Sequence, residues 1–280
     1  MLFAINHCFR RTLIGMLFFL FSTAQASEVY SWSVVPQFTG IAVHRDWTPL
    51  LQAIEKETGV RFQLKIYESI PDFEIGVLEG KPDFAYMNPY HAVMANTAQG
   101  YVPLIRDGKR KLTGILVAKS NSAFKTLQDL QGQQIAFPSP NAFAASLYMR
   151  ALLAEKEGIE YTPIYTKTHS NSFRFVMRNK TAASGGVYRT LRRERPEVQR
   201  QLQVIYKAPS TPSHPIVFHP RVPSDVAMKV QQSIIALANT ETGKTILTAI
   251  LLPEPIVADY ARDYEPLVKL NLEKYFIQPQ

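Results

Sequence analysis

Cysteine is nearly absent from this sequence. Cys8 is the only cysteine among the 280 residues, and it lies in an N-terminal segment that we expect to be removed. The remaining chain would then have no thiol, which excludes a disulfide framework, a thiolate metal site and a cysteine nucleophile. About 250 residues are enough to be held together by a hydrophobic core alone, in one large domain or in two smaller ones.

Long apolar runs are also scarce, and the most apolar one is short. It covers residues 13–21 (LIGMLFFLF), which is too short to span a bilayer. Arg10 and Arg11 precede the run, and Ala24-Gln25-Ala26 follows it with small residues at the positions that cleavage needs. This order predicts a cleaved secretory signal peptide over residues 1–26, and therefore a periplasmic protein. The alternative is an uncleaved membrane anchor.

Catalytic and metal-binding motifs are missing as well. The sequence contains no Gly-x-Ser-x-Gly, no His-Glu-x-x-His and no Walker loop. His169, His214 and His219 do not have the spacing of metal ligands. We therefore expect no metal, no cofactor and no enzymatic activity.

Positive charge exceeds negative charge along the chain. The formal net charge is +8, and removal of Arg10 and Arg11 with the signal peptide leaves +6. Basic residues cluster at 106–111 and 189–195, where acids or turn residues interrupt them, so we interpret both clusters as solvated faces. The overall balance weakly favours anionic ligands and does not indicate a nucleic-acid partner.

What the sequence does contain is an alternation of helix-like and strand-like segments. Apolar residues recur at helical spacing over 43–54, and Gly59 ends that segment. Residues 60–66 then alternate between apolar and polar, which predicts a half-buried strand. The rhythm restarts at 112–118 and includes a strong helix at 142–157. This order is typical of α/β folds in which helices cover both faces of a mostly parallel sheet.

Two such blocks predict a two-lobed α/β clamp with a cleft between the lobes. We expect the first lobe to be discontinuous, formed by residues 27–113 and 217–280. The second lobe would comprise residues 114–216. The chain would cross between the lobes near residues 113–119 and 207–218, and these crossings would act as hinges.

Four strand-to-helix corners carry side chains that could meet a ligand. In open α/β sheets, ligands bind at the carboxyl ends of strands, where helix N-termini present N–H groups. The corners lie at residues 35–39, 86–91, 139–145 and 169–172. They predict a pocket rich in aromatic and amide side chains, formed by Phe38, Tyr86, Asn88, Tyr90, Phe143 and Asn171, with Ser170 beside it. The alternatives are that the two tyrosines pack in the core and that residues 170 and 171 only cap a helix.

Several of these segments also carry a family resemblance. The segments are Trp47-Thr48-Pro49-Leu50, Glu57-Thr58-Gly59, Asp83-Phe84-Ala85-Tyr86-Met87-Asn88-Pro89-Tyr90-His91, Leu127-Gln128-Asp129-Leu130-Gln131-Gly132 and Pro212-Ser213-His214-Pro215. Together, in this order, the chain resembles the phosphate/phosphite/phosphonate-binding family of periplasmic substrate-binding proteins. The resemblance covers nearly all of the chain after the signal peptide. It implies a type II periplasmic-binding fold and a receptor role in an ATP-driven uptake system.

The resemblance also assigns ligand positions, and this sequence departs from the family there. The Ser-Thr-Ser-type stretch that holds the phosphonate in the family falls on Ala142-Phe143-Ala144, which has no hydroxyl. A family histidine falls on Asn171, and an acidic residue that faces the ligand's amine falls on His214. Hydrogen bonds to a charged oxygen contribute about 1.5–3 kcal/mol each, so their loss argues against a phosphonate. We expect a ligand that is anionic or partly apolar, other than free phosphate or phosphonate.

Three classes of function fit this sequence to different degrees. The leading interpretation is a monomeric receptor that captures a small molecule by hinge closure and docks on a membrane permease. The second is a receptor of the same shape that presents its ligand to a sensor protein. The third is a secreted enzyme on the same fold, which the missing catalytic motifs disfavour.

Overall fold

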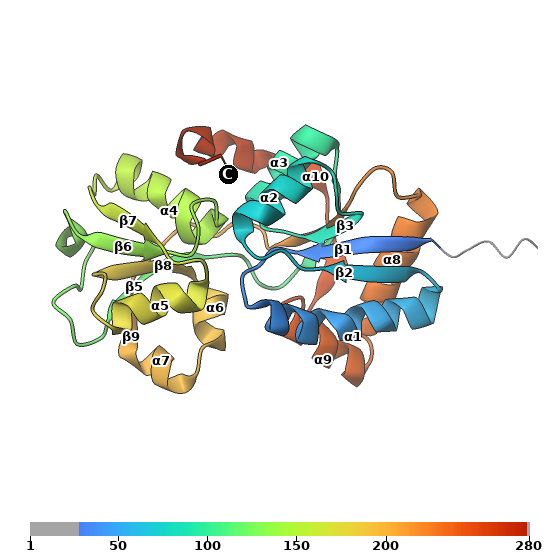
Figure 1. Ribbon diagram of the computed structural model, residues 1–280, viewed down its shortest axis with the longest axis horizontal. Coiled ribbons are helices and arrows are strands. Elements are labelled where there is room, and N and C mark those ends of the chain that lie inside the picture. The colour runs from blue at the N-terminus through green and yellow to red at the C-terminus, as the bar shows by residue number, and fades with distance from the viewer. Residues whose placement is uncertain (1–27, 279–280) are drawn as a thin grey trace, which may run out of the picture.

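The computed structural model describes residues 28–278. The predicted signal peptide, residues 1–26, lies outside these residues. Two β-sheets lie side by side along the longest axis of the molecule, and helices cover both faces of each (Figure 1). This arrangement confirms the predicted two-lobed α/β fold. Within residues 28–278, no helix combines the length and apolar character that are needed to cross a membrane.

The first lobe is built on a six-stranded sheet. Its strands, in spatial order, are β2 (Arg61–Lys65), β1 (Val29–Val34), β3 (Phe84–Tyr86), β10 (Pro215–Phe218), β4 (Val102–Asp107) and β11 (Pro255–Val257). One face is covered by α1 (Gly40–Thr58), α8 (Ser224–Leu237) and α9 (Glu241–Ala249). The other face is covered by α2 (Ile70–Leu78), α3 (Pro89–Gln99) and α10 (Tyr260–Asp263). Two 3-10 segments, Glu265–Leu270 and Leu272–Tyr275, follow.

The second lobe is built on a five-stranded sheet. Its strands, in spatial order, are β7 (Thr162–Tyr165), β6 (Gln134–Phe137), β8 (Ala183–Val187), β5 (Gly114–Lys119) and β9 (Leu202–Lys207). The helices are a 3-10 turn (Gln128–Leu130), α5 (His169–Met177), α6 (Tyr188–Arg193) and α7 (Pro196–Gln201). A further continuous helix begins with a π-helical turn (Phe143–Leu147), continues as α4 (Tyr148–Ala151) and ends in a second π-helical turn (Leu152–Lys156).

The expectation of mostly parallel sheets is wrong in both lobes. Pairing is parallel only across β2-β1-β3 and across β7-β6-β8. The strands that carry the chain between the lobes pair antiparallel, as in β4 with β10 and β5 with β9. The reason is topological: β4 leaves the first lobe beside β10, which returns to it, so the two must run in opposite directions.

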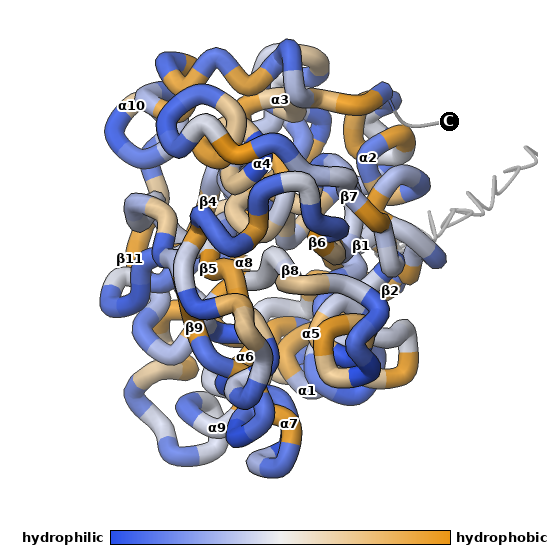
Figure 2. The backbone as a smooth tube through the Cα atoms, turned by 90° about the vertical axis from the view of Figure 1, so that its left-hand side faces the viewer, coloured by the Kyte–Doolittle hydropathy of each residue, from blue (hydrophilic) through white to orange (hydrophobic). Residues whose placement is uncertain are grey.

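Apolar side chains fill the interior of each lobe. In the first lobe, Trp32 stacks on Phe84 at a ring-centroid distance of 5.4 Å and also contacts Trp47 at 6.0 Å. In the second lobe, Ile115 and Val117 of β5 pack against apolar residues of α5. Figure 2 shows the same pattern along the chain, with apolar stretches at β5 and α5 and hydrophilic stretches around the outline. The alternating exposure of β2 matches the half-buried strand predicted at 60–66.

The last described residues of the first lobe reach across to the second lobe. Arg150, a buried residue of α4, donates from Nη2 to the backbone oxygen of Tyr275 at 2.6 Å. Asn141 donates to the oxygen of Ile277 at 2.7 Å and accepts from its N–H at 3.0 Å. Lys274 forms an ion pair with Glu155 of the second lobe. We call residues 272–277 the C-terminal tie, because they connect the lobes at a place separate from the two chain crossings.

Candidate functional site

Five of the predicted site residues meet where the lobes touch. Asn88 of the first lobe and His214 of the return crossing lie beside Ala142, Phe143 and Ala144 of the second lobe. Gln37 and His169 add polar side chains to the lining, and the remaining lining residues are apolar: Val35, Ile70, Leu112, Ala145 and Val187. The cavity among them measures only about 10 Å³, roughly the space of one water molecule. We call this place the corner site; at this volume it has no room for a solute.

Phe143 is the main reason that the corner site is filled. Its side chain is 1 % exposed. The ring stacks between Tyr90 and Tyr148, with centroid distances of 5.8 Å to each. Tyr90 donates from its hydroxyl to Glu273 at 3.0 Å, so its polar end is also occupied. Tyr90 therefore packs in the core, which is the alternative that the sequence left open for it.

The floor of the corner site is polar but uncharged. His214 is buried, and its Nε2 accepts a hydrogen bond from the amide nitrogen of Gln37 at 3.0 Å. Burial and the nearby positive charge of Arg189 hold the pKa of His214 well below its ordinary value. Nδ1 of His214 is buried without a hydrogen-bond partner among the described residues. A neutral imidazole carries no charge, unlike the acidic residue that the sequence resemblance implies at this position.

Ser170 and Asn171 make contacts away from this floor. Ser170 donates to a carboxylate oxygen of Glu194. Asn171 donates to the backbone oxygen of Thr166 at 3.0 Å. The cap of α5 is Thr168, whose hydroxyl accepts from the N–H of Asn171 at 3.2 Å, so the prediction that residues 170 or 171 cap the helix is wrong. His169, which our site prediction omitted, is the residue of this turn that lines the corner site.

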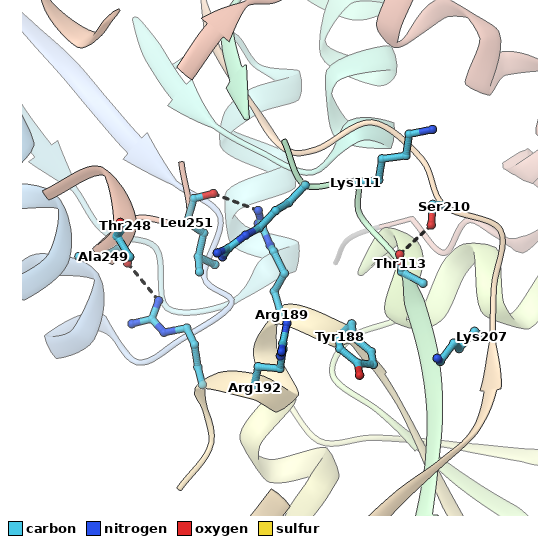
Figure 3. Close-up of a pocket in the computed structure, with 12 residues that line it drawn as sticks. Lys111, Thr113, Tyr188, Arg189, Arg192, Lys207, Ser210, Thr248, Ala249 and Leu251 are labelled. Atoms are coloured by element: carbon cyan, nitrogen blue, oxygen red, sulfur yellow. Dashed lines mark hydrogen bonds between the residues drawn. The ribbon is translucent and has the colours of Figure 1, made fainter. Parts of the chain in front are cut away.

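A much larger cavity opens between the lobes next to the corner site. It measures about 900 Å³ (Figure 3). The lining combines six basic residues with polar and small apolar ones: Arg110, Lys111, Thr113, Tyr188, Arg189, Arg192, Arg193, Lys207, Ser210, Thr248, Ala249 and Leu251. Not one of these lining residues is acidic. We call this cavity the basic pocket.

The basic pocket unites the two charge clusters of the sequence. Residues 110 and 111 lie on the first crossing, and residues 189–193 belong to α6 of the second lobe. Residues 110, 111, 192 and 193 are exposed, in agreement with our interpretation of both clusters as solvated faces, and they also line one concave surface. The density of basic residues in 188–195 was the available signal, but a local pattern does not reveal which distant segment it will face.

Two arginines of α6 connect the pocket to the first lobe. Arg189 donates from Nη1 to the backbone oxygen of Leu251 at 3.0 Å and from Nη2 to the hydroxyl of Tyr86 at 3.1 Å. The Tyr86 ring in turn stacks on His214 and lies 4.8 Å from the ring of Trp47. Arg189 thus joins the second lobe to the aromatic core of the first.

Arg193 makes the second connection. It forms a 2.8 Å ion pair with Asp46 of α1, donates to the backbone oxygen of Ala249, and lies over the ring of Phe38 at 4.4 Å. Burial of Asp46 opposes its ionisation, but hydrogen bonds from Arg45 and Arg193 outweigh it and lower the pKa of this carboxyl group. Phe38 therefore lies against an arginine of the pocket wall and outside the corner site.

Comparisons with known proteins place the chain among transport receptors. A family model described as "ABC transporter, phosphonate, periplasmic substrate-binding protein" matches residues 32–264. The "Phosphonates-binding periplasmic protein" of Escherichia coli (strain K12) is 24 % identical over 219 residues, which cover 72 % of this chain and 64 % of that protein.

Three solved structures share the fold at low identity. A binding protein component of an ABC phosphonate transporter from Pseudomonas aeruginosa has a TM-score of 0.79 at 16 % identity, covering 88 % of this chain and 86 % of that one. PhnD1 from Prochlorococcus marinus (MIT 9301), in complex with methylphosphonate, has a TM-score of 0.79 at 13 % identity, covering 89 % and 99 %. A Xanthomonas citri protein bound to ATP has a TM-score of 0.69 at 15 % identity, covering 88 % and 98 %.

Proposed function

Because this chain belongs to the family of periplasmic substrate-binding proteins of phosphonate ABC transporters, we propose that it captures an anionic solute in the basic pocket. A member of this family is a binding protein and not an enzyme. The observation that carries the proposal is the lining of the pocket, which contains six cationic side chains and no acidic one. We further propose that the loaded receptor docks on a membrane permease in the periplasm, as the family implies.

Electrostatics support an anionic ligand. A cleft lined by charges of one sign raises the local concentration of the opposite charge and accelerates its capture. Guanidinium groups bind carboxylate, phosphate and phosphonate oxygens through two parallel hydrogen bonds. A cationic ligand would have to enter against repulsion from every charged residue of the wall.

Because the corner site is filled, we propose that the ligand lies in the neighbouring basic pocket. The residues that fall on the family's Ser-Thr-Ser stretch have no hydroxyl, and the ring of one of them, Phe143, fills this place. The basic pocket begins next to this corner and offers about 900 Å³. We therefore propose an organic anion that is larger than free phosphate or methylphosphonate. Two proteins of the same fold support this proposal, because one is in complex with methylphosphonate and the other is bound to ATP, a much larger phosphorus oxyanion.

Ligand capture would proceed by hinge closure. The two crossings run side by side, with backbone pairing between Leu112 and Thr211 and a 2.8 Å hydrogen bond between the hydroxyls of Thr113 and Ser210. The bonds of Arg189 and Arg193 to the first lobe would form as the lobes approach each other. We propose that rotation at the crossings opens the pocket on the side of α6.

A thermal-shift screen of residues 27–280 tests this proposal. The panel contains phosphate, methylphosphonate, sulfonates, carboxylates, amino acids, sugar phosphates and nucleotides. A ligand at 100-fold its dissociation constant should stabilise the chain by about 2.7 kcal/mol, which raises Tm by several degrees. We expect organic anions to stabilise and cationic solutes to have no effect.

A matched variant distinguishes ligand binding at the corner site from ligand binding in the basic pocket. Phe143→Ser restores a hydroxyl at the corner site, so it should raise the affinity for methylphosphonate and leave larger anions unaffected. Stabilisation by cationic or neutral solutes alone would overturn the anionic assignment. Micromolar binding of phosphate or methylphosphonate to the unmodified chain would overturn the assignment to the basic pocket.

A further inference from the structure

Most of the charge in the basic pocket has no counter-charge. Of its six cations, Arg193 is neutralised by Asp46 at 2.8 Å. Arg189 makes its two hydrogen bonds to neutral oxygens, those of Leu251 and Tyr86, and its positive charge also acts on the buried carboxyl group of Asp107. Its Nε is buried and has no hydrogen-bond partner among residues 28–278.

The other four cations are Arg110, Lys111, Arg192 and Lys207. In the part of the chain that the structure describes, none of them forms an ion pair with a carboxylate. Arg192 and Lys207 lie over the ring of Tyr188, at 5.5 Å and 5.6 Å from its centroid. The pocket thus holds four positive charges without counter-charge, and their mutual repulsion favours any ligand that neutralises several of them at once.

These cations come from separate segments of the chain. Residues 110 and 111 precede β5, Lys207 ends β9, and Arg192 lies on α6. In Figure 3, Arg192 and Lys207 flank Tyr188 on one side of the cavity, and Lys111 lies on the other. Positive charge is therefore distributed around the cavity. A ligand with one compact anionic group could contact only part of it.

We infer that the basic pocket binds an organic molecule that carries two or more phosphate groups, an inference that rests on the anionic ligand proposed above. Two phosphate groups carry about −3 to −4 at pH 7, whereas a single one carries at most about −2. Only the former balances most or all of the four free positive charges. The volume of about 900 Å³ lies near the upper end of the range for sites that enclose a drug-sized molecule. Leu251, Ala249 and the ring of Tyr188 provide apolar surface for its organic body.

Isothermal titration calorimetry on residues 27–280 tests the inference with a matched pair of sugars. The probes are fructose 1,6-bisphosphate and fructose 6-phosphate, which differ by one phosphate group. We expect the bisphosphate to bind at least about tenfold more tightly, because the second group adds charge-assisted hydrogen bonds. The difference should shrink as salt is raised from about 0.01 M to 0.15 M, since screening weakens the interaction of exposed charges.

A pair of charge-matched double variants locates the effect. Arg192→Gln with Lys207→Gln should reduce the affinity for the bisphosphate at least about tenfold and remove the preference over the monophosphate. Lys229→Gln with Lys244→Gln removes the same net charge from exposed ion pairs on α8 and α9, and should leave both affinities unchanged. All four substituted side chains are exposed, so both double variants should fold; thermal melting checks this.

Different outcomes would overturn the multiple-phosphate inference and the proposed function. Equal affinity for the two sugars, measured at low salt, would overturn the inference and leave the anionic receptor intact. An equal loss in both double variants would also overturn it, because the effect would then arise from net charge and not from the pocket. Binding of no anion in the panel, under conditions where other solutes stabilise the chain, would overturn the proposed function itself.

Discussion

His169 and His214 place two neutral imidazoles at the floor of the cleft. Burial lowers the pKa of His169 from 6.5 to about 4. His214 has its pKa lowered by burial first and then by the charge of Arg189. Both side chains can gain a proton more easily in the unfolded chain than in the folded one. Their contribution to stability is therefore complete above pH 6.5 and is lost as the pH falls below it; for His169 the loss continues down to about pH 4.

We predict that His169→Gln reduces the acid sensitivity of the fold. For the unmodified chain, protonation of this histidine in the unfolded state should cost about 2 kcal/mol of the free energy of unfolding between pH 7 and pH 4.5. Glutamine does not titrate and can keep the hydrogen bond with Thr190, whose hydroxyl lies 3.3 Å from Nδ1. Urea denaturation at both pH values measures the difference. His44→Gln, at an exposed position, serves as the control, and an equal pH effect in both variants would contradict the prediction.

The π-helical turn Phe143–Leu147 is the element that shapes the corner site, and two glycines let it approach the sheet. A Cβ atom on Gly114 would lie 2.1 Å from the backbone oxygen of Ala144. A Cβ atom on Gly185 would lie 2.1 Å from the backbone oxygen of Ala145. The turn therefore rests directly on β5 and β8, and its position depends on residues without side chains.

We predict that Gly185→Ala displaces this turn. The added methyl group would collide with backbone and with the ring of Phe137 at 2.5 Å, which should lower the free energy of unfolding by about 2–3 kcal/mol. Gly40→Ala is the matched control, because its methyl group would meet only the flexible side chain of Ile66 at 3.3 Å. Urea denaturation of the two variants compares them. Equal stability of both would show that the turn can move at little cost.

Sequence patterns predicted the positions of helices and strands better than they predicted which segments pack against one another. The stop at Gly59, the strand near 60–66 and the helix near 142–157 all appear in the structure, because short-range spacing and capping determine them. The family predicted from the sequence is also confirmed. The antiparallel pairing of the crossing strands was missed, since it depends on how the two lobes are connected. The basic pocket was missed for a similar reason, because its charges come from segments that meet only when the lobes pack together.

At the scale of the whole molecule, the C-terminal tie restricts how the lobes can move. It connects residues 272–277 to the second lobe through buried Arg150 and through Asn141, which also donates to Glu74 of the first lobe at 2.9 Å. The basic pocket and the bonds of α6 to the first lobe form a separate set of interlobe contacts. Movement that preserves the tie would separate α6 from the first lobe and leave the corner site closed.

We predict that removal of residues 272–280 loosens the connection between the lobes. Arg150 would lose the backbone oxygen of Tyr275 and remain buried with fewer partners, so Tm should fall by about 5 °C. The radius of gyration, measured by small-angle X-ray scattering, should increase. Lys274→Gln removes only the exposed ion pair with Glu155 and should change neither quantity. An unchanged radius and Tm in the shortened chain would refute a role of the tie in holding the lobes together.

The contact of Arg189 with Tyr86 has a consequence for spectroscopy. Trp32 and Trp47 are the two tryptophans of the sequence, and both lie in the first lobe. Trp47 adjoins Tyr86, whose hydroxyl is bound by an arginine of the opposite lobe, whereas Trp32 is fully buried beside Phe84. Separation of α6 from the first lobe would alter the surroundings of one indole and spare the other. The chain thus contains a native fluorophore at the joint between its lobes, so their opening and closing can be followed in real time without a label.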